Sequence, residues 1–600
     1  MQTNMRYWEY YNMTDTFTDL YGRSKQGDTF NRLYDLITSR ENILLAYRTI
    51  KSNKGSKTEG TDGKKIDDIK TMKGEEIVSE IQRILLNYQP KKVRRVFIPK
   101  PNGDKRPLGI PSIMDRIIQQ CFKQVLEPIA EAKFYNHSYG FRPQRSTHHA
   151  IARVQHLINH AYLHYVVDID IKGFFDNINH TLLLKQLWNM GIQDKKVLKI
   201  VSKMLKAEIE GEGIPHRGTM QGGILSPLLS NIVLNDLDHW VADQWELFET
   251  DHKYSRNTSK YLGLNKNSNL KEGYIIRYAD DFKIMCKDWK TAEKWFHAVR
   301  LYLKDRLKLE ISPEKSQIVN LRKRKSKFLG FTIWTEQKRN KHVAHTGLIR
   351  KKKQEIKQKY KEHIKIIQKS PKAKNITLFN SFVLGIHNYF KKATMVNIEF
   401  AQIAYDLSRF IYNRLKSIGK YEKPKNPSKV YKKFYKNAYK TYKVNGIYLF
   451  PIADVQTSNN INFSQDITPF TVEGRNKIHQ KLKPNVAYEV NRLMQSYIPN
   501  RTTEYMDNRI SRYSMKNGKC EISGEFLPAE FVHCHHHKPV SLGGTDEFRN
   551  LRIIHKDIHI LVHATKDETI QRLVKFLKLT DEQLKKINQY RKVCNLELIG

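Results

Sequence analysis

Apolar side chains alternate on both sides of an acidic pair near the middle of the chain. They occupy positions 274, 276 and 278 before Asp280 and Asp281, and positions 282, 284 and 286 after them. A period of two is typical of β-strands, so the pattern predicts two strands joined by a tight turn that carries both carboxylates. Adjacent ionised carboxylates repel each other unless a cation lies between them, and their oxygens suit Mg²⁺. A solvated turn is the alternative interpretation, because Asp is common in turns.

A further strand pattern, at residues 164–176, contains two more carboxylates. The apolar positions 167, 169 and 171 face one way along this strand, and Asp168 and Asp170 face the other way. An unpaired carboxylate is costly in a buried strand, so these side chains should have partners. If the fold pairs this strand with the acidic hairpin, Asp170, Asp280 and Asp281 would hold two Mg²⁺ ions roughly 3.5–4 Å apart, as in two-metal phosphoryl transfer.

Helical periodicity dominates much of the remaining chain. Residues 1–90 have a mostly helical pattern, and further helices are predicted at 115–133, 146–160 and 225–240. The basic stretch 343–445 contains three apolar stripes at helical spacing, namely Ile356, Tyr360, Ile364 and Ile367, then Leu378, Phe382, Ile386 and Tyr389, and then Leu407, Ile411 and Leu415. Residues 246–272 are polar and irregular.

Residues 93–110 predict a β-hairpin with basic side chains. Its cations are Lys100, Lys105 and Arg106. Lys and Arg supply the charge-assisted donors that a triphosphate needs, so this hairpin is a candidate nucleotide cradle. Ordinary surface charge is the alternative.

The composition indicates a polyanionic partner and a reducing environment. The chain has 105 Lys and Arg against 61 Asp and Glu, a net charge of +44. This excess is typical of nucleic-acid-binding proteins, whereas a membrane surface would require a concentrated amphipathic anchor. The five cysteines lack paired spacing, which disfavours disulfides. No apolar run approaches ~18 residues and the N-terminus lacks a signal-peptide core, so we expect a cytoplasmic protein of several domains.

Six motifs together resemble those of reverse transcriptases. They are segments 170–176 (Asp-Ile-Lys-Gly-Phe-Phe-Asp) and 278–281 (Tyr-Ala-Asp-Asp), with 106–111, 137–145, 218–227 and 328–331. Their order along the chain resembles, more narrowly, that in the proteins encoded by mobile group II introns. The resemblance covers nearly the whole chain, most strongly between Arg94 and Phe331 and again near the C-terminus.

The resemblance implies an α+β multidomain fold with a right-hand polymerase. The expected parts are an N-terminal extension with the first fingers helices (1–92), reverse transcriptase fingers and a palm with an antiparallel sheet (93–335), a helical thumb or maturase domain (336–455), a DNA-binding region (456–515) and a C-terminal ββα-metal (HNH) domain (516–600).

For the polymerase site, the resemblance implies that Asp170, Asp280 and Asp281 are catalytic and bind two Mg²⁺ ions. The residues expected to contact the incoming nucleotide are Lys105, Arg106, Phe175, Gln221, Gly222 and Lys315. Phe175 would be the aromatic gate that excludes a 2′-hydroxyl and favours DNA synthesis, with a buried core Phe as the alternative. Lys315 could contact phosphates, act as a general acid or simply cap a turn. Met220 stands where the family usually has Pro.

Basic and aromatic residues supply further candidate contacts with nucleic acid. Segment 431–442 interleaves Tyr and Lys, which can stack on bases and neutralise phosphates, although a solvated basic helix fits equally well. The predicted RNA- or DNA-binding residues are Arg142, Lys351, Lys352, Lys353, Tyr431, Lys432, Lys433, Arg501 and Arg509.

The C-terminal segment resembles an HNH endonuclease. The resemblance rests on consecutive histidines, a Gly-Gly pair, Asn550, and His559 nine residues after it. It implies that His536 is the general base, that His535 and His559 hold one divalent cation, expected to be Mg²⁺, and that Asn550 positions the base loop. His563 is an alternative ligand, and the run 535–537 permits a one-residue shift. The spacing of the cysteines disfavours a four-cysteine zinc site.

These expectations describe a multifunctional group II intron-encoded protein. It would bind its intron RNA and assist splicing, nick target DNA, and extend the freed 3′ end with dNTPs along an RNA template. The expected partners are therefore intron RNA, target DNA and dNTPs, without a membrane, and a homodimer is left open. The alternatives are a splicing-only RNA-binding maturase and a reverse transcriptase that is not part of an intron.

Overall fold

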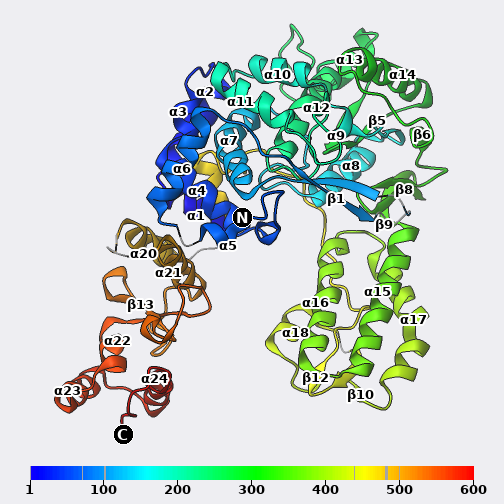
Figure 1. The fold of residues 1–600 in the computed structure, drawn as a ribbon. Helices are drawn as coiled ribbons and strands as arrows, with labels where there is room; N and C mark the ends of the chain where they lie inside the picture. Colours follow the sequence, from blue (N-terminus) through cyan, green and yellow to red (C-terminus); the bar gives the residue numbers. More distant parts are fainter. Residues whose placement is uncertain are drawn as a thin grey trace. The chain divides into compact units, whose positions relative to one another are not determined.

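The computed structural model describes residues 2–70, 72–99, 103, 105–437, 439–479, 484–496, 498 and 501–600 (Figure 1). The chain divides into two compact units whose segments interleave along the sequence. The first unit contains residues 1–133, 184–228 and 466–600, and the second contains residues 134–183 and 229–465. Helices α10 (His180–Asn189) and α12 (Ser226–Asp243) each include residues of both units. Both units mix helices with antiparallel strands, which confirms the predicted mixed fold class.

The second unit is built on a four-stranded antiparallel sheet in the order β4-β5-β3-β6. Its strands are β3 (Tyr165–Ile169), β4 (Tyr274–Tyr278), β5 (Asp281–Cys286) and β6 (Gln317–Asn320). Strands β4 and β5 form the hairpin predicted around the acidic pair, and β5 also pairs with β3. Helices α8 (Thr147–Ala161) and α14 (Trp289–Asp305) pack against this sheet. Almost every position of β4 and β5 is buried on both faces of the sheet, including the charged residues Arg277 and Lys283.

A smaller sheet and a group of long helices follow in the same unit. The sheet contains β7 (Ser326–Phe328), β8 (Phe331–Lys338) and β9 (Lys341–Leu348). The helices are α15 (Arg350–Lys369), α16 (Ala373–Phe390) and α17 (Val396–Leu415), and the predicted stripe of α15 is fully buried. On α16 the prediction was wrong, because Leu378 and Tyr389 are exposed and the buried face is formed by Ile376, Phe379, Val383 and Phe390. Apolar residues surround much of α16, so periodicity alone did not select its core face.

The remaining elements of the second unit are short. They are α9 (Phe174–Asn177), α13 (Asn257–Asn267), β10 (Gly419–Glu422), α18 (Lys429–Phe434), β11 (Thr441–Val444) and β12 (Ile447–Tyr448). Helix α13 lies inside the segment expected to be irregular, so that expectation was wrong. This helix is mostly exposed and buries only Leu264, which explains its weak apolar signal.

The first unit begins with a group of helices, as the pattern predicts. They are α1 (Gln2–Tyr10), α2 (Thr14–Gln26), α3 (Leu33–Ile37), α4 (Arg40–Lys51), α5 (Ile66–Ile69), α6 (Gly74–Leu86), α7 (Ile113–Glu131) and α11 (Lys195–Leu205). Strands β1 (Arg94–Pro99) and β2 (Lys105–Ile110) form the predicted antiparallel hairpin. Lys100, one of the hairpin cations, lies outside the described residues.

The C-terminal part of the first unit has its own apolar core. Its elements are α19 (Val472–His479), α20 (Pro484–Gln495), α21 (Thr503–Met515), β13 (Val532–His536), β14 (Leu551–His555), α22 (Lys556–His563), α23 (Asp567–Leu577) and α24 (Asp581–Val593). A capping box, Thr580 with Gln583, begins α24. The N-terminal helices contact this part through a buried ion pair between Arg48 Nε and Asp507 Oδ2, 2.7 Å apart.

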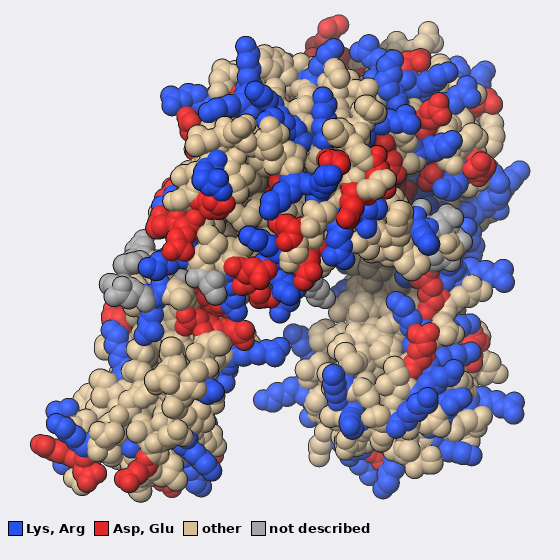
Figure 2. Space-filling view, in the orientation of Figure 1, with Lys and Arg blue, Asp and Glu red and all other residues tan. Residues whose placement is uncertain are grey.

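Basic side chains are spread over the visible surface, and acidic residues form smaller groups between them (Figure 2). Among the described helices, none has the combination of length and apolar character that crossing a bilayer requires.

Candidate functional site

Two carboxylate segments meet at one end of the four-stranded sheet. Ile169, the last residue of β3, lies opposite Phe282 of β5, so the antiparallel register brings the next residue, Asp170, beside Asp281. Tyr278 pairs with Asp281 across the hairpin, which leaves Asp280 in the turn. The carbonyl of Asp170 accepts a hydrogen bond from the backbone N–H of Ser312 over 2.7 Å. The three predicted carboxylates therefore lie on adjacent strand ends.

The turn between β4 and β5 is held by a buried guanidinium. Arg277 is 1% exposed, and its Nη1 donates to the carbonyl of Ala279 over 2.8 Å and to Asn231 Oδ1 over 2.9 Å. Its Nε and Nη2 contact the fully buried Asp238 carboxylate at 2.6–2.9 Å. Ala279 has a φ of +58°, which is uncommon for a residue with a side chain. These contacts stabilise the conformation that presents Asp280 and Asp281.

Close backbone packing also fixes this turn. A Cβ atom on Gly140 would lie 2.2 Å from the backbone nitrogen of Ala279, so only glycine fits there. The carbonyl of Gly140 accepts a hydrogen bond from Asn231 Nδ2 over 2.7 Å. These contacts hold Gly140 against both the acidic turn and α12.

Burial and neighbouring carboxylates raise the proton affinity of Asp281. Burial raises the pKa of Asp281 to about 6, and the charges of Asp168 and Asp280 act in the same direction, whereas the buried ammonium of Lys283 lowers this pKa. Lys283 Nζ lies 2.8 Å from Asp168 Oδ1, which gives Asp168 the partner expected for a carboxylate in a strand. A cation bound here would relieve the repulsion around Asp281, so the site fits a hard divalent ion.

The other predicted residues of this unit differ in their surroundings. Lys315 is exposed, and its Nζ lies 3.4 Å from Asp170 Oδ2. Phe175, on α9, is half-buried and its ring lies 5.4 Å from that of the buried Phe174. Phe174 is therefore the core residue of the pair, and Phe175 retains an accessible ring.

The predicted nucleotide contacts of the first unit lie on β2 and on the Gln221–Gly222 loop, whose backbones pack closely together. Lys105 and Arg106 are exposed on β2, where Arg106 pairs with Ile98. Farther along β2, the N–H of Gly109 donates to the carbonyl of Gln221 over 2.8 Å. Gly222 has a φ of +110°, and a Cβ atom there would lie 2.6 Å from the Gly109 carbonyl oxygen. The Gln221–Gly222 loop is thus pinned to the hairpin by contacts that require glycine.

The C-terminal histidines lie on two paired strands and the following helix. Strand β13 pairs with β14, with His535 opposite Arg552 and His536 opposite Leu551, and α22 presents His559 and His563 one turn apart. His535 Nδ1 lies 3.3 Å from His559 Nδ1 and 3.4 Å from His563 Nε2. Burial lowers the pKa of His535 to about 2 and that of His559 to about 3, with further lowering from neighbouring imidazoles. Both rings are therefore neutral, as metal ligation requires.

His536 has a different set of partners. Its Nε2 lies 2.7 Å from Asp546 Oδ1, and its ring stacks on Tyr505 with centroids 5.2 Å apart. Asp546 Oδ2 accepts a hydrogen bond from Thr502 Oγ1 over 2.5 Å, and its carbonyl accepts one from Asn508 Nδ2 over 2.8 Å. Thr502, the N-cap of α21, and Asn508 on this helix thus position Asp546, which in turn positions His536.

Asn550 closes the loop between the two strands. Its Nδ2 donates to the carbonyls of Lys538 and Thr545, each over 2.9 Å, and its Oδ1 accepts from the N–H of Lys538 over 2.8 Å. Gly544 packs so closely that a Cβ atom would lie 1.8 Å from the Lys538 carbonyl oxygen. These contacts fix the loop that follows His536.

Comparison with known proteins now decides the family. The reverse transcriptase (RNA-dependent DNA polymerase) family matches residues 98–333. The group II intron-encoded protein LtrA of Lactococcus lactis subsp. cremoris is 32% identical over 461 residues, which cover 65% of this chain and 75% of that protein. This chain belongs to the family of group II intron-encoded proteins.

Two further relatives differ in coverage. Protein YkfC of Escherichia coli (strain K12) is 36% identical over 305 residues, 48% of this chain and 79% of that protein. The putative COX1/OXI3 intron 1 protein of Saccharomyces cerevisiae is 30% identical over 333 residues, 50% of this chain and 39% of that protein. In this group II intron-encoded protein, the reverse transcriptase match contains the three carboxylates of the sheet end.

Three of the predicted nucleic-acid contacts require correction. Arg142 and Arg509 are each 4% exposed, and their Nη atoms donate to backbone carbonyls, those of Tyr135 and Ser138 for Arg142 and that of Leu493 for Arg509. Tyr431 is buried in the core of the second unit, where its ring lies 5.8 Å from that of Phe450. These side chains stabilise the fold and do not present themselves to a polyanion.

The remaining predicted contacts are at least partly accessible. Lys351, Lys432, Lys433 and Arg501 are exposed, whereas Lys352 and Lys353 are half-buried. Lys352 pairs with Glu355 over 2.9 Å and Lys353 with Glu399 over 2.5 Å, so these two are partly neutralised. The guanidinium of Arg501 lies 4.7 Å from the centre of the Tyr505 ring, which in turn stacks on His536.

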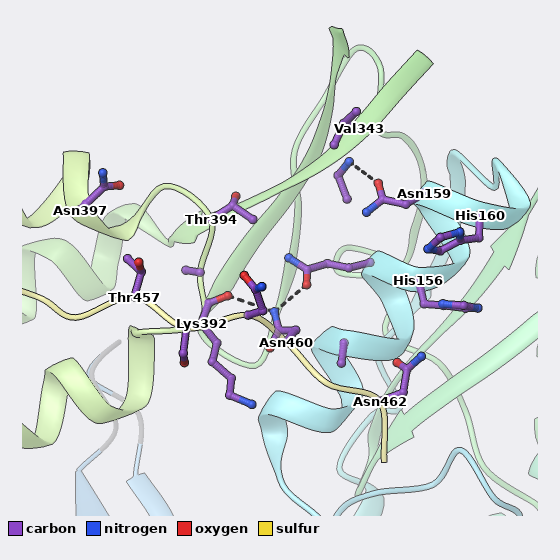
Figure 3. A pocket seen from close by; sticks show the side chains of 16 residues that line it. His156, Asn159, His160, Val343, Lys392, Thr394, Asn397, Thr457, Asn460 and Asn462 are labelled. Carbon is purple, nitrogen blue, oxygen red and sulfur yellow. Dashed lines mark hydrogen bonds between the residues drawn. The ribbon is translucent and has the colours of Figure 1, made fainter. Parts of the chain in front are cut away.

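A cavity of about 530 Å³ lies in the second unit between α8, β9 and residues 457–462 (Figure 3). Its lining is polar and includes Lys392, His156 and several Asn side chains. Asn460 donates to Gln155 Oε1 over 2.5 Å and to the carbonyl of Lys392 over 3.0 Å, as the dashed lines show. None of the predicted site residues lines this cavity.

The sequence reasoning missed residues that act through others. Arg277 directly precedes the Tyr-Ala-Asp-Asp motif, but its buried partner Asp238 comes from a distant helix. Asp546 follows the Gly-Gly pair and was visible as a carboxylate near His536 in sequence.

Proposed function

We propose that this group II intron-encoded protein synthesises DNA on an RNA template, with Asp170, Asp280 and Asp281 as its catalytic carboxylates. The observation that carries the proposal is the β3–β5 register, in which Ile169 lies opposite Phe282 and Asp170 therefore adjoins Asp281. In this proposal the four-stranded sheet is the palm, and α15, α16 and α17 form the thumb.

The residues of the sheet end would each have a distinct role. Two Mg²⁺ ions held by the three carboxylates would supply activation of the primer 3′-hydroxyl and stabilisation of the departing pyrophosphate. Phe175 would pack against the sugar of the incoming nucleotide and exclude a 2′-hydroxyl. Lys315, exposed beside Asp170, would contact the phosphates. For Lys105, Arg106, Gln221 and Gly222 we retain the nucleotide-binding roles that the resemblance implies.

Primer extension tests the polymerase proposal. The double substitution Asp280→Asn with Asp281→Asn should abolish DNA synthesis on a primed RNA template in the presence of Mg²⁺. Asp251→Asn, which changes an exposed carboxylate of the same unit, is the matched control and should leave synthesis intact. Persistent synthesis by the double variant would refute the assignment.

We also propose that the protein binds its intron RNA and assists splicing. Family membership supports this role, because one relative carries the name nuclear intron maturase 2 and others are intron proteins. The exposed cations Lys351, Lys432 and Lys433 would neutralise RNA phosphates. Splicing of the intron RNA by the double Asp variant should persist. If the wild-type protein splices but never extends a primer, the splicing-only alternative is correct.

Finally, we propose that the C-terminal histidines nick target DNA. His536 would act as general base, held by Asp546, and Asn550 would fix the loop between the strands. His535 and His559, with Nδ1 atoms 3.3 Å apart, would hold one divalent cation that polarises the scissile phosphate. His536→Ala should remove nicking and leave primer extension unchanged. Nicking that survives this substitution would exclude His536 as the base.

A further inference from the structure

A cysteine lies among the C-terminal histidines. The ligand atoms of His535, His563 and Cys594 all lie within 4.8 Å of one another, and no other group of three or more such residues occurs in the described part of the chain. They come from β13, from the last residue of α22 and from the residue after α24. Three separate elements therefore converge on one point.

The position of Cys594 is fixed by a neighbouring buried cation. Arg591, near the end of α24, is 2% exposed, and its Nη1 donates to the carbonyls of Leu561 and Ala564 over 2.9 and 2.8 Å. These carbonyls belong to the C-terminal end of α22 and the residue after it. The N–H of Cys594 donates to the carbonyls of Tyr590 and Arg591. Arg591 thus ties α24 to α22 and brings the thiol next to His563.

His535, one of the three residues, has a ring nitrogen without a hydrogen-bond partner. It is 1% exposed, and its Nε2 is buried without a hydrogen-bond partner among the described residues. An unsatisfied buried polar atom is costly, so this nitrogen calls for an ion or another partner. This observation is independent of the position of Cys594.

The donor set selects the kind of ion. Two imidazole nitrogens and one thiolate are the ligands of tetrahedral Zn²⁺ sites, and a thiolate does not suit Mg²⁺. We propose that His535, His563 and Cys594 form a binding site for Zn²⁺ or a similar thiophilic divalent ion. The site goes beyond the HNH resemblance, which assigns no role to Cys594.

This site shares His535 with the cation of the proposed nuclease. An ion on His535, His563 and Cys594 would link β13, α22 and α24, and it would make the ion next to His536 a zinc-type ion. The metal site itself does not depend on DNA cleavage. Metal binding is measured directly, so a chain that binds the ion but does not nick DNA would refute only the nuclease proposal.

Cobalt binding to the full-length protein tests the site. Co²⁺ replaces Zn²⁺ in such sites, and a thiolate ligand gives a charge-transfer absorption that imidazoles do not give. The wild-type protein should bind Co²⁺ with this absorption, and Cys594→Ser should lose it. Because outer-shell partners alone change metal affinity by about 10–100-fold, loss of this ligand should weaken binding at least about 100-fold. Cys520→Ser, which alters a buried thiol of the same unit, should retain the absorption.

A second measurement uses the wild-type chain alone. The other four cysteines are buried, so Cys594 should be the thiol that reacts first with an alkylating reagent. Zn²⁺ should protect Cys594 from this reaction, and Mg²⁺ should not. A charge-transfer band that survives in Cys594→Ser, cobalt binding without such a band in the wild type, or alkylation of Cys594 that Zn²⁺ leaves unchanged would each overturn the proposal.

Discussion

Arg277 donates a hydrogen bond to the carbonyl of Ala279, 2.8 Å away, and so connects a buried ion pair to the turn that carries the acidic motif. The guanidinium also donates hydrogen bonds to Asp238 and Asn231 of α12. The geometry of Asp280 and Asp281 therefore depends on a helix that is distant in sequence. Proposed catalytic carboxylates need a fixed geometry, and this contact fixes the turn that carries them.

Arg277→Lys should damage both stability and DNA synthesis. A lysine cannot contact Asp238 in two places and Ala279 at once, and breaking a buried pair costs about 3–5 kcal/mol. We expect a lower unfolding temperature and at least a tenfold loss in the rate of primer extension. The matched control is Arg300→Lys, because Arg300 is an exposed cation of the same unit. An Arg277→Lys protein with wild-type kinetics would contradict the role of this contact.

Gly222→Ala should weaken dNTP binding more than Gly211→Ala, a glycine substitution at a site with free space around it. Gly222 and Gly211 both have positive φ values, +110° and +77°, so alanine is strained at each, by about 1–2 kcal/mol in the left-handed region. Only at Gly222 would the new Cβ meet a backbone oxygen, at 2.6 Å, whereas Gly211 has nothing within 4 Å. We expect a higher KM for dNTPs in Gly222→Ala than in Gly211→Ala. Equal values for the two variants would show that the close approach does not matter.

The strands and the three carboxylates could be predicted because each is marked by a pattern of residues close together in the sequence. Alternation identified β3, β4 and β5, and the acidic pair marked the turn between two of them. Arg142, Arg509 and Tyr431 could not be assigned correctly, because a basic or aromatic residue looks the same in sequence whether it is buried or exposed. The role of Asp238 depends on the tertiary position of α12, which no local pattern encodes.

Asp546 should act on DNA nicking only through His536. Asp546→Asn should lower the nicking rate by about 10–100-fold, because the imidazole loses the carboxylate that orients it. Primer extension should be unchanged. In the His536→Ala variant, added imidazole should replace the missing base and restore nicking. In the double variant His536→Ala with Asp546→Asn, the imidazole-rescued nicking rate should be nearly the same. If the rescued reaction loses the same factor, Asp546 acts on the metal site, the DNA or the fold instead.

A buried histidine should make the helical part of the second unit sensitive to acid. Burial lowers the pKa of His387 to about 4, and its Nε2 contacts the carbonyl of Ile452 at 2.9 Å. The unfolded chain, with a pKa of about 6.5, binds the proton more readily, so stability is lost as pH falls through the window from about 6.5 to about 4. Between pH 7 and pH 5 this linkage is worth about 2 kcal/mol.

Calorimetry of the His387→Asn variant checks this assignment. The variant should be less stable at pH 7, but its unfolding temperature should fall less between pH 7 and pH 5 than that of the wild type. His252→Asn, which removes an exposed histidine of the same unit, should keep the wild-type pH dependence. An unchanged pH dependence in His387→Asn would assign the acid sensitivity to other groups.

The central claim is that carboxylates from two distant segments hold a common cation, and cleavage by bound iron tests it most directly. Fe²⁺ in place of Mg²⁺, with ascorbate and peroxide, cuts a protein chain next to the bound ion. We predict cuts near residue 170 and near residues 280–281, and Asp170→Asn should remove both sets of cuts together. Cuts near the C-terminal histidines should persist as an internal control. Cuts near 280–281 that survive unchanged in Asp170→Asn would contradict the shared site.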